Sequence, residues 1–553
     1  MVLLKYNLMK FFLNTLLLTL FLSCSPSEKE ESTIGEKPNI ILIMADDMGF
    51  SDLGFMGSGI ETPNIDRLAN KGIVFNQFYN AGRCCPTRAS LVTGLYAHNS
   101  DLGWMTASDF GRPGYRGAIS KNSVTLAQVL KTAGYENYMT GKWHLTYDKN
   151  MVDGADNSNW PIQRGFDKYY GVLSGGGGYY IPTTLTDGNE RLNPDEDFYL
   201  TEAINKSTVE MLEDHFETKK ETPFFFYVAH YAPHRPLHAL ENDINKYKGK
   251  FSKGWDYFRE QRFKTMNESG LTNAWVLSQR PANIPDWTSL SGKEKAMWEM
   301  RMEIYAAQID RMDQGIGQII DLLEKNNELD NTIIMFLSDN GGNAEPEGKD
   351  FDADTIVNPG DNNFNQSYRR HWANMSNTPF RLYKSSNHEG GISTPLIVHW
   401  PKKIKQASIT NQQGHVIDLM PTFMELTGAT YPEELNGEKI KSYQGKSLLS
   451  AIEGETSERG PLFFEHQADR AVIDGKWKLV STKAGKKPYK GKWELYDLSV
   501  DRSEENNLII KHPEIANELE QKWNKWAEEN NVLPLDGRGW NKRVKSDINK
   551  NKK

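Results

Sequence analysis

The sequence predicts an α/β fold with one large central sheet, mixed but mostly parallel and sandwiched by helices, followed by a smaller C-terminal α+β domain with an antiparallel sheet. Three observations predict it. Short, continuous apolar runs recur along most of the chain, patterns of helical spacing lie between them, and both give way to turn-separated runs past about residue 450. Strands that alternate with helices are typical of parallel sheets, because parallel neighbours need a crossover connection.

Three apolar runs predict central strands, at residues 39–44, 224–228 and 332–337. A strand buried on both faces of a sheet has a continuous apolar run of this kind, although periodicity alone does not exclude a buried helix. Each run leads directly into acidic, amide or histidine side chains. Because ligands gather at the carboxyl ends of the strands in such sheets, these polar residues are candidates for a site.

Helices are predicted over 124–131 and 302–323, where apolar residues recur at helical spacing. In the C-terminal part, a turn at Asp474-Gly475 separates two strand-like runs, and residues 493–498 add another. A further helix is predicted over about 513–528.

The composition is that of a globular chain, and it excludes one broad class of function. The 553 residues carry a net charge of -8 with a pI near 5.9, whereas nucleic-acid-binding proteins usually present a basic face. We therefore expect no nucleic-acid partner. An anionic substrate has to be held by a local cluster of cations, since the chain as a whole is acidic.

The N-terminus has the pattern of an export signal. Lys5 and Lys10 precede an apolar run over 11–22 that is too short to span a bilayer as a helix. Cys24 follows, then a polar segment, as in a bacterial lipoprotein signal whose cysteine becomes the lipidated first residue. We expect an exported protein, in the bacterial periplasm or at the cell surface, that meets the membrane only through a lipid anchor at Cys24. The alternative is a plain signal peptide with an incidental cysteine.

Two of the three cysteines, Cys84 and Cys85, are adjacent. A disulfide between them would be strained, because neighbouring Cα atoms lie only about 3.8 Å apart whereas bridged cysteines usually lie about 4.4–6.8 Å apart. Pro86 suits the first turn of a helix that continues to a stop at Gly94. Cys84 is therefore expected at a helix N-terminus, where free N–H groups and the helix dipole favour an anion, with Arg88 one turn further on.

The stretch Cys84-x-Pro86-x-Arg88, continuing to Thr93-Gly94, resembles the signature of the sulfatase family. In that family a formylglycine-generating maturation enzyme oxidises the first cysteine of the signature. Only Cys84 has proline two residues on and arginine four residues on. The resemblance therefore assigns the formylglycine modification to Cys84.

Further matches to the family follow in its order between about residues 38 and 400. They are Asp46-Asp47, Gly141-Lys142-Trp143-His144, Ala232-Pro233-His234-x-Pro236, Ser338-Asp339-Asn340-Gly341, and Lys384 with Glu389-Gly390-Gly391. The resemblance implies an alkaline phosphatase-like fold. The predicted parts of the chain are a lipoprotein-type signal peptide (1–24), a polar linker (25–36), a catalytic sulfatase domain (37–450), a small C-terminal domain (451–540) and a basic disordered tail (541–553).

The resemblance also implies a calcium site, formed by Asp46, Asp47, Asp339 and Asn340 together with the modified Cys84. Hard oxygen ligands without a cluster of histidine and cysteine suit calcium better than zinc. An acidic pair after a strand is often only a helix cap. Two such sets after two predicted strands argue against that interpretation.

The catalytic residues that the resemblance implies are Cys84, Arg88, Lys142, His144, His234 and Lys384. Hydrated formylglycine at Cys84 would attack the sulfur of a sulfate ester, and His234, with Lys384 beside it, would donate a proton to the leaving alcohol. His144 would act as the base that releases sulfate and restores the aldehyde. The three cationic residues would neutralise the sulfate and the charge that develops on it.

Two more histidines, His388 and His466, are candidates for substrate contact. His388 lies beside one of the motifs and has an equal claim to a structural role, whereas His466 fits a contact between the two domains at least as well. The glycine run 175–178 is predicted to be a flexible loop rather than a phosphate cradle, because no nucleotide-binding pattern accompanies it. Residues 175–181, the insertion at about 240–295 and the small domain are expected to shape the substrate pocket.

Three functions fit the sequence. The first is an exported, calcium-dependent sulfuric ester hydrolase that acts on sulfated carbohydrates or aryl sulfates. The second is a phosphonate or phosphate ester hydrolase on the same scaffold, and the third is a non-catalytic, glycan-binding surface lipoprotein. Because all the expected catalytic positions are filled, the sequence favours the first over the third.

Overall fold

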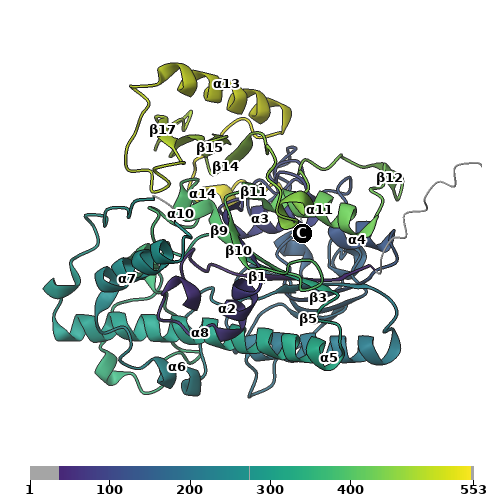
Figure 1. Cartoon of the computed structure of the whole chain (residues 1–553), viewed down its shortest axis with the longest axis horizontal. Coiled ribbons are helices and arrows are strands. Elements are labelled where there is room, and N and C mark those ends of the chain that lie inside the picture. Colours follow the sequence, from purple (N-terminus) through teal and green to yellow (C-terminus); the bar gives the residue numbers. More distant parts are fainter. Residues whose placement is uncertain (1–36, 273–274, 550–553) are drawn as a thin grey trace, which may run out of the picture. The chain divides into compact units, whose positions relative to one another are not determined.

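The predicted central sheet is present, with helices on both of its faces (Figure 1). The computed structural model describes residues 37–272 and 275–549, so the predicted signal peptide, the linker and Cys24 lie outside the described residues. The strand order is β10-β2-β9-β8-β1-β7-β3-β4-β5-β6, with β11 paired beside β2. The strands are β1 (Asn39–Ala45), β2 (Ile73–Tyr79), β3 (Glu136–Lys142), β4 (Lys168–Val172), β5 (Leu185–Asp187), β6 (Glu190–Arg191), β7 (Phe224–Ala229), β8 (Thr332–Ser338), β9 (Ser393–His399), β10 (Ser408–Thr410) and β11 (Gly414–His415).

The centre of the sheet is parallel, as predicted. Strands β8, β1, β7, β3 and β4 are parallel neighbours, whereas β9 runs antiparallel to both β8 and β2. The register aligns Ala45 at the end of β1 with Ser338 at the end of β8. It also aligns Gly141 with Ala229 near the ends of β3 and β7. The carboxyl ends of these four strands therefore open at one edge, where the polar residues of the motifs follow.

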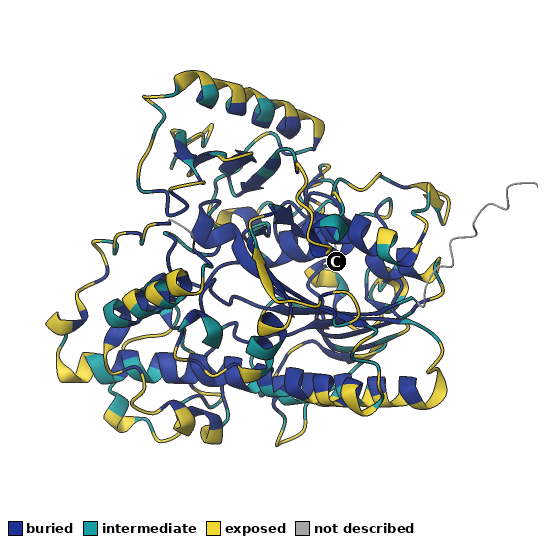
Figure 2. Ribbon diagram, viewed as in Figure 1, coloured by how far each residue is buried: buried dark blue, intermediate teal, exposed yellow. Residues whose placement is uncertain are grey.

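Both faces of β1 are covered, which explains its unbroken apolar run. Ile41 and Ile43 on one face pack in a core with α2 (Pro63–Asn70), α5 (Leu200–Thr218) and α8 (Gly292–Lys325). Ile40 and Leu42 on the other face pack in a second core, whose helices are α3 (Cys84–Thr93), α4 (Leu126–Lys131) and α11 (Leu419–Thr427). Figure 2 shows the buried strands between helices whose outer sides are exposed.

Both helices predicted in the large domain are present, and each begins with a capping box. Thr125 and Gln128 cap α4, and Ser291 and Glu294 cap α8. The start of α8, at Gly292, lies before the predicted start at residue 302, because its first turns are mostly polar and show little helical periodicity. The other helices are α6 (Glu241–Tyr247), α7 (Gly254–Glu268), α9 (Arg369–Ser376), α10 (Glu389–Ile392) and α12 (Leu449–Ile452), with 3-10 turns at Gly54–Met56, Asp148–Asn150, Ile162–Arg164, Trp287–Ser289, Ala353–Thr355 and Val416–Asp418.

The C-terminal part forms the predicted small antiparallel sheet with one helix across it. The strands β14 (Leu462–His466), β15 (Asp469–Asp474), β16 (Trp477–Ser481) and β17 (Glu494–Asp497) pair in sequence order, and a short ribbon of β12 (Glu434–Leu435) and β13 (Glu438–Lys439) precedes them. The predicted turn Asp474-Gly475 joins β15 to β16. Helix α13 (Pro513–Glu529) covers one face of the sheet with Leu519 and Trp523, which confirms the helix predicted over 513–528.

The end of the described chain differs from the prediction of a disordered tail over 541–553. Residues as far as 549 pack against the large domain through α14 (Trp540–Val544). The Arg543 guanidinium lies 5.1 Å from the centre of the Trp104 ring, and Asp547 accepts a hydrogen bond of 2.5 Å from the Tyr147 hydroxyl. The lysine-rich composition concealed these contacts, because they depend on partners about 400 residues away. Among the described helices, none is both long and apolar enough to cross a membrane.

Candidate active site

Cys84 is the first residue of α3, as the sequence predicts. Arg83 before it is extended, with φ of -154°, and the helix ends at Gly94, whose φ of 67° is the left-handed conformation that glycine adopts readily. The whole helix is buried. Cys84 therefore presents its side chain where the first N–H groups of a buried helix are free.

The acidic and amide residues that follow β1 and β8 meet, because these strands are neighbours in register. The backbone N–H of Asp47 donates to Oδ1 of Asp339 at 3.2 Å, and Nδ2 of Asn340 donates to Oδ1 of Asp47 at 2.7 Å. Together with Asp46 these side chains are all buried. The two halves of the predicted calcium site thus form one cluster.

Arg88 and Lys142 donate hydrogen bonds to two of the carboxylates in the buried interior of the protein. Arg88 donates from Nε and Nη2 to Oδ2 of Asp339, at 3.0 and 2.8 Å, and from Nη1 to the backbone oxygen of Lys142. Lys142 in turn donates to Oδ2 of Asp46. Both cations are fully buried, so the structure places them as groups that position the acids. Their predicted contact with sulfate stays a prediction.

Asp47 pairs with Lys384, the third cation of the cluster. The Nζ atom of Lys384 lies 2.6 Å from Oδ1 of Asp47, and Nδ2 of Asn343 donates to Oδ2 at 2.9 Å. Nε2 of His234 lies 3.5 Å from the same Oδ2 atom. Asp46, Asp47 and His234 bring one ligand atom each within 4.8 Å of one another. Asp47 thus links the predicted metal ligands to the predicted proton donors.

The cluster fits a hard divalent cation. Oδ1 of Asp46 and Oδ1 of Asn340 are buried, and neither has a hydrogen-bond partner in the described part of the chain. Burial and the charge of Asp339 raise the pKa of Asp46 well above its ordinary value, because several carboxylates enclosed together resist ionisation. A bound cation would satisfy the two free oxygens and stabilise the charged carboxylates. The donors are oxygens, which suits calcium.

His144 lies against the cysteine pair. It follows β3 with φ of 57°, and its Nε2 atom lies 3.0 Å from Sγ of Cys85. Burial lowers the pKa of His144 to about 4, so the ring is neutral at pH 7 and can accept a proton. Gly175 closes over this ring, where a Cβ atom would lie 1.8 Å from Cε1. The close contact explains why a glycine stands at this point of the 175–178 run.

His234 is oriented by its neighbour. Nδ1 donates to the backbone oxygen of Arg235 at 2.6 Å, which directs Nε2 toward Asp47. Burial, assisted by the charges of Lys142 and Lys384, holds the pKa of His234 well below its ordinary value. The ring is therefore neutral at pH 7.

The thiols of the cysteine pair differ in acidity. A hydrogen bond from Cys85 is the main cause that lowers the pKa of Cys84 well below its ordinary value, and Lys142 and Lys384 add to it, although burial opposes the shift. Burial raises the pKa of Cys85 well above its ordinary value. Cys85 is thus the donor of the pair and stays a thiol.

A cleft of about 370 Å³ opens over these groups. Cys84, His144, His234 and Lys384 line it. Four residues predicted from separate motifs therefore share one cavity, at the carboxyl edge of the sheet.

A family model described as Sulfatase matches residues 38–429, and a model described as N-sulphoglucosamine sulphohydrolase, C-terminal, matches residues 381–529. The chain belongs to the sulfatase family. Two relatives align over most of both chains. An uncharacterized sulfatase of Schizosaccharomyces pombe is 33% identical over 541 residues, which cover 90% of this chain and 95% of the relative. An N-acetylglucosamine-6-O-sulfatase of Bacteroides thetaiotaomicron is 27% identical over 572 residues, which cover 91% and 88%.

A solved structure of similar architecture is that of Ps i-CgsB, with a TM-score of 0.65 and 25% identity over 92% of this chain and 96% of that one. The sulfatase thus has the alkaline phosphatase-like fold that its sequence predicts, and it is a sulfuric ester hydrolase.

The cleft of the sulfatase has further walls that were not predicted. Glu345 accepts from Arg83 at 2.9 Å and from Arg235 at 3.0 Å, and all three line the cleft. The two arginines could have been found, since they directly precede Cys84 and directly follow His234. No sequence motif pointed to Glu345.

Trp540 is another wall of the cleft that no sequence motif singled out. It comes from α14, is 46% exposed, and lies beside Trp104 with 5.1 Å between the ring centres. The small domain and the segment after it therefore bring an exposed aromatic ring to the catalytic cleft.

The two remaining candidates lie outside the cleft of the sulfatase. His388 shares hydrogen bonds with Arg381 at 2.9 Å and with Ser386 at 3.2 Å, near Glu494 of β17. His466, at the end of β14, is fully buried, and neither ring nitrogen has a partner among the described residues. Neither histidine is among the residues that line the cleft, so their substrate contact stays a prediction.

Proposed function

We propose that this sulfatase is an exported, calcium-dependent enzyme that removes sulfate from sulfated carbohydrates by means of a formylglycine made from Cys84. The observation that carries the proposal is the convergence on Cys84: a helix N-terminus, two histidines and a buried acid cluster meet around one cysteine in the cleft. The name of the Bacteroides thetaiotaomicron relative supports a sulfated sugar as substrate.

Asp46, Asp47, Asp339 and Asn340 would hold the calcium ion. When bound, the ion supplies Lewis acidity that polarises a sulfate oxygen and offsets negative charge in the cleft. Lys142 and Arg88 keep two of the carboxylates in place, as their hydrogen bonds show. Lys384 is the cation of this cluster that also lines the cleft, so it is placed to contact the sulfate directly.

The modified Cys84, once hydrated, supplies a hydroxyl nucleophile for the sulfur atom. His144 is neutral and adjacent, so it is suited to accept a proton. His234 is neutral in the free enzyme, but a sulfate bound beside it would offset the nearby lysine charges that lower its pKa. His234 would then carry the proton that the leaving alcohol needs.

The test is mass spectrometry of the peptide that contains Cys84, from protein made in its own type of cell. We expect formylglycine at Cys84 and an unmodified thiol at Cys85. Cys84→Ala is expected to abolish hydrolysis of an aryl sulfate, whereas the matched variant Cys85→Ala keeps the modification and measurable activity. Full activity in protein whose Cys84 is unmodified would contradict the mechanism.

Substrate class needs a separate measurement. A panel of sulfated monosaccharides that differ only in sulfate position is expected to contain at least one substrate with a higher kcat/KM than any phosphodiester or phosphonate analogue. The opposite preference would favour the phosphonate or phosphate ester hydrolase. Export and lipidation through Cys24 are tested by fatty-acid labelling, which Cys24→Ser should abolish.

A further inference from the structure

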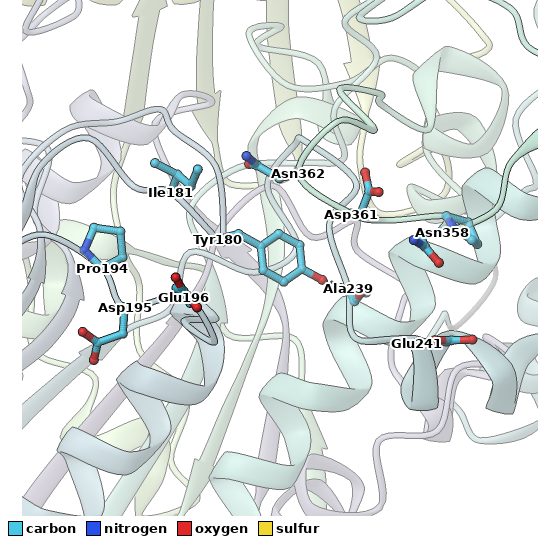
Figure 3. A pocket seen from close by; sticks show the side chains of 11 residues that line it. Tyr180, Ile181, Pro194, Asp195, Glu196, Ala239, Glu241, Asn358, Asp361 and Asn362 are labelled. Atoms are coloured by element: carbon cyan, nitrogen blue, oxygen red, sulfur yellow. Dashed lines mark hydrogen bonds between the residues drawn. The ribbon is translucent and has the colours of Figure 1, made fainter.

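A second cavity, of about 640 Å³, is lined by segments of the chain that also line the catalytic cleft. We call it the outer pocket and define it by Tyr180, Ile181, Glu196, Asn358, Asp361 and Asn362, which line it together with their neighbours. Figure 3 shows the Tyr180 ring within the cavity and polar side chains around it. None of the groups proposed to act on sulfate lines this pocket.

Three segments of the chain each line both cavities. The loop over 174–183 contributes its two ends to the cleft and its tip, Tyr180 and Ile181, to the outer pocket. The segment 234–241 and the segment 345–362 likewise pass from one cavity to the other. Because Gly177 lines the cleft and lies three residues before Tyr180, their Cα atoms are at most about 11 Å apart. Parts of the two cavity walls therefore lie within the length of a few linked rings of each other.

The Tyr180 ring is held in a fixed orientation. Its hydroxyl donates to the backbone oxygen of Ala239 at 2.9 Å, and its ring packs at 5.3 Å from Tyr199 and at 5.5 Å from His238. The hydroxyl is thus engaged by the protein, while the ring, which is half-buried, is left to line the cavity. A fixed aromatic ring with one open side is a platform for another flat, partly apolar ring.

The polar groups of the outer pocket are amides and carboxylates. The side chains of Asn358, Asn362 and Glu196 form no hydrogen bonds with the described residues, whereas Asp361 accepts one from the backbone N–H of Asn363 at 2.8 Å. These groups can pair with ligand hydroxyls at little cost, since no protein hydrogen bond has to be broken.

The two cavities differ in charge. The cleft is lined by Arg83, Arg235 and Lys384, whereas none of the residues that line the outer pocket is a lysine or an arginine and several are acidic. Like charges placed close together without a counter-ion are unfavourable. The outer pocket therefore disfavours a sulfated ring and accepts an uncharged one.

We infer that the outer pocket binds an uncharged sugar unit of an oligosaccharide whose sulfated unit occupies the cleft. That a sulfated unit occupies the cleft rests on the proposed function, whereas binding of an uncharged sugar unit in the outer pocket does not. It makes the preferred substrate an oligosaccharide with an unsulfated neighbour, rather than a monosaccharide or a densely sulfated chain.

The kinetic test compares Tyr180→Ala and Asn362→Ala with the wild-type enzyme on a sulfated oligosaccharide and on an aryl sulfate. We expect the ratio of the two kcat/KM values to fall about tenfold in each variant, the change that a loss of about 1.4 kcal/mol in binding produces. Val357→Ala is the matched control, because Val357 is 87% exposed and lies next to Asn358 without lining the pocket. Asn362→Ala keeps the test valid if Tyr180→Ala does not fold.

A direct binding test separates this inference from the proposed function. Saturation-transfer NMR would measure binding of a chemically desulfated tetrasaccharide from algal galactan, which carries no charged group, to the full chain. Binding by the wild type that is lost in Asn362→Ala and kept in Val357→Ala supports the outer pocket even if no sulfatase activity is found. Equal binding by all three proteins, or an unchanged kinetic ratio, would overturn the inference.

The acidic side chains of the outer pocket can be tested separately. Glu196→Gln with Asp361→Asn is expected to raise, by about tenfold relative to the singly sulfated oligosaccharide, the kcat/KM for one that also carries sulfate on the neighbouring unit. No change in that ratio would show that charge does not set the preference.

Discussion

The amine of Lys384 lies 2.6 Å from Oδ1 of Asp47, although 337 positions separate the two residues in the chain. Asp47 follows the central strand β1, and Lys384 comes from the loop that leads through α10 into β9. The pair joins the acid cluster to the cleft. Of the described lysines and arginines, only Lys384 both binds Asp47 and lines the cavity.

Replacement of Lys384 by methionine keeps most of the side-chain length and removes the charge. We expect kcat on an aryl sulfate to fall by about 10²–10³, the usual cost of one lost group that stabilises developing charge. Lys349→Met, at an exposed lysine, is the control and should behave as the wild type. Steady-state kinetics give the result, and a loss of less than twofold would show that the Lys384 amine does not act on the reacting sulfate.

Removal of calcium is expected to lower both activity and stability. Asp46, Asp47, Asp339 and Asn340 are buried together, and a calcium ion bound by them in the folded state alone would stabilise that state by linkage, by about 2.7 kcal/mol when its free concentration is a hundred times Kd. The measurement is thermal unfolding and hydrolysis rate after chelation and after calcium is restored. Asp46→Asn should lose the calcium-dependent shift, and an equal melting temperature with and without calcium would argue against the site.

Trp540 is expected to support the substrate ring rather than the chemistry. Its exposed ring lines the cleft but has no group that could transfer a proton at neutral pH. Trp540→Ala should raise KM about tenfold with little change in kcat, as the loss of one aromatic contact of about 1.4 kcal/mol predicts. Trp540→Phe retains an aromatic face and should recover most of the affinity. A variant that lowers kcat alone would contradict this role.

Glu303 of α8 gives a prediction about stability and pH. It is 8% exposed, and it accepts the backbone N–H of Gly249 at 2.8 Å. Burial raises its pKa from 4.5 to about 7. The folded state therefore holds this proton at pH values where the unfolded state has lost it, and stability falls as the pH rises from about 4.5 through 7.

Glu303→Gln removes that charge and keeps an oxygen for the Gly249 N–H. We expect the free energy of unfolding in urea to rise by about 2 kcal/mol at pH 8 and to change little near pH 4.5. Asp321→Asn, at an exposed position of the same helix, is the control and should show no such pH dependence. An equal effect of Glu303→Gln at both pH values would refute the buried-charge explanation.

Much of the fold could be predicted because its signals are local. The apolar runs at β1, β7 and β8 are unbroken since both faces of each strand are buried, and that burial pattern is visible in the sequence itself. The same holds for α3, whose start at Cys84 and stop at Gly94 are marked by Pro86 and by the glycine. Helix α8 was predicted too short, since its capping box at Ser291 precedes turns that are mostly polar.

The candidate site was predicted residue by residue but not pair by pair. The motifs named His234 and Lys384, which line one cavity, and Asp47, which pairs with Lys384, because each stands just after a strand or in a loop at the carboxyl edge. They did not reveal that the guanidinium group of Arg88 is occupied by hydrogen bonds inside the protein. Its partners Asp339 and Lys142 lie at the ends of different strands, far from Arg88 in the sequence.

The sequence by itself therefore determined which residues are candidates for the chemistry, because the proposed nucleophile, the acids and the histidines stand in short motifs beside predicted strands. The tertiary structure alone decided what surrounds them. Strand order paired each buried acid with its cation, and packing of the C-terminal segment against Trp104 brought Trp540 to the cleft. The outer pocket likewise exists only where three distant segments meet. These features depend on long-range contacts between side chains, and no local pattern of residues encodes such contacts.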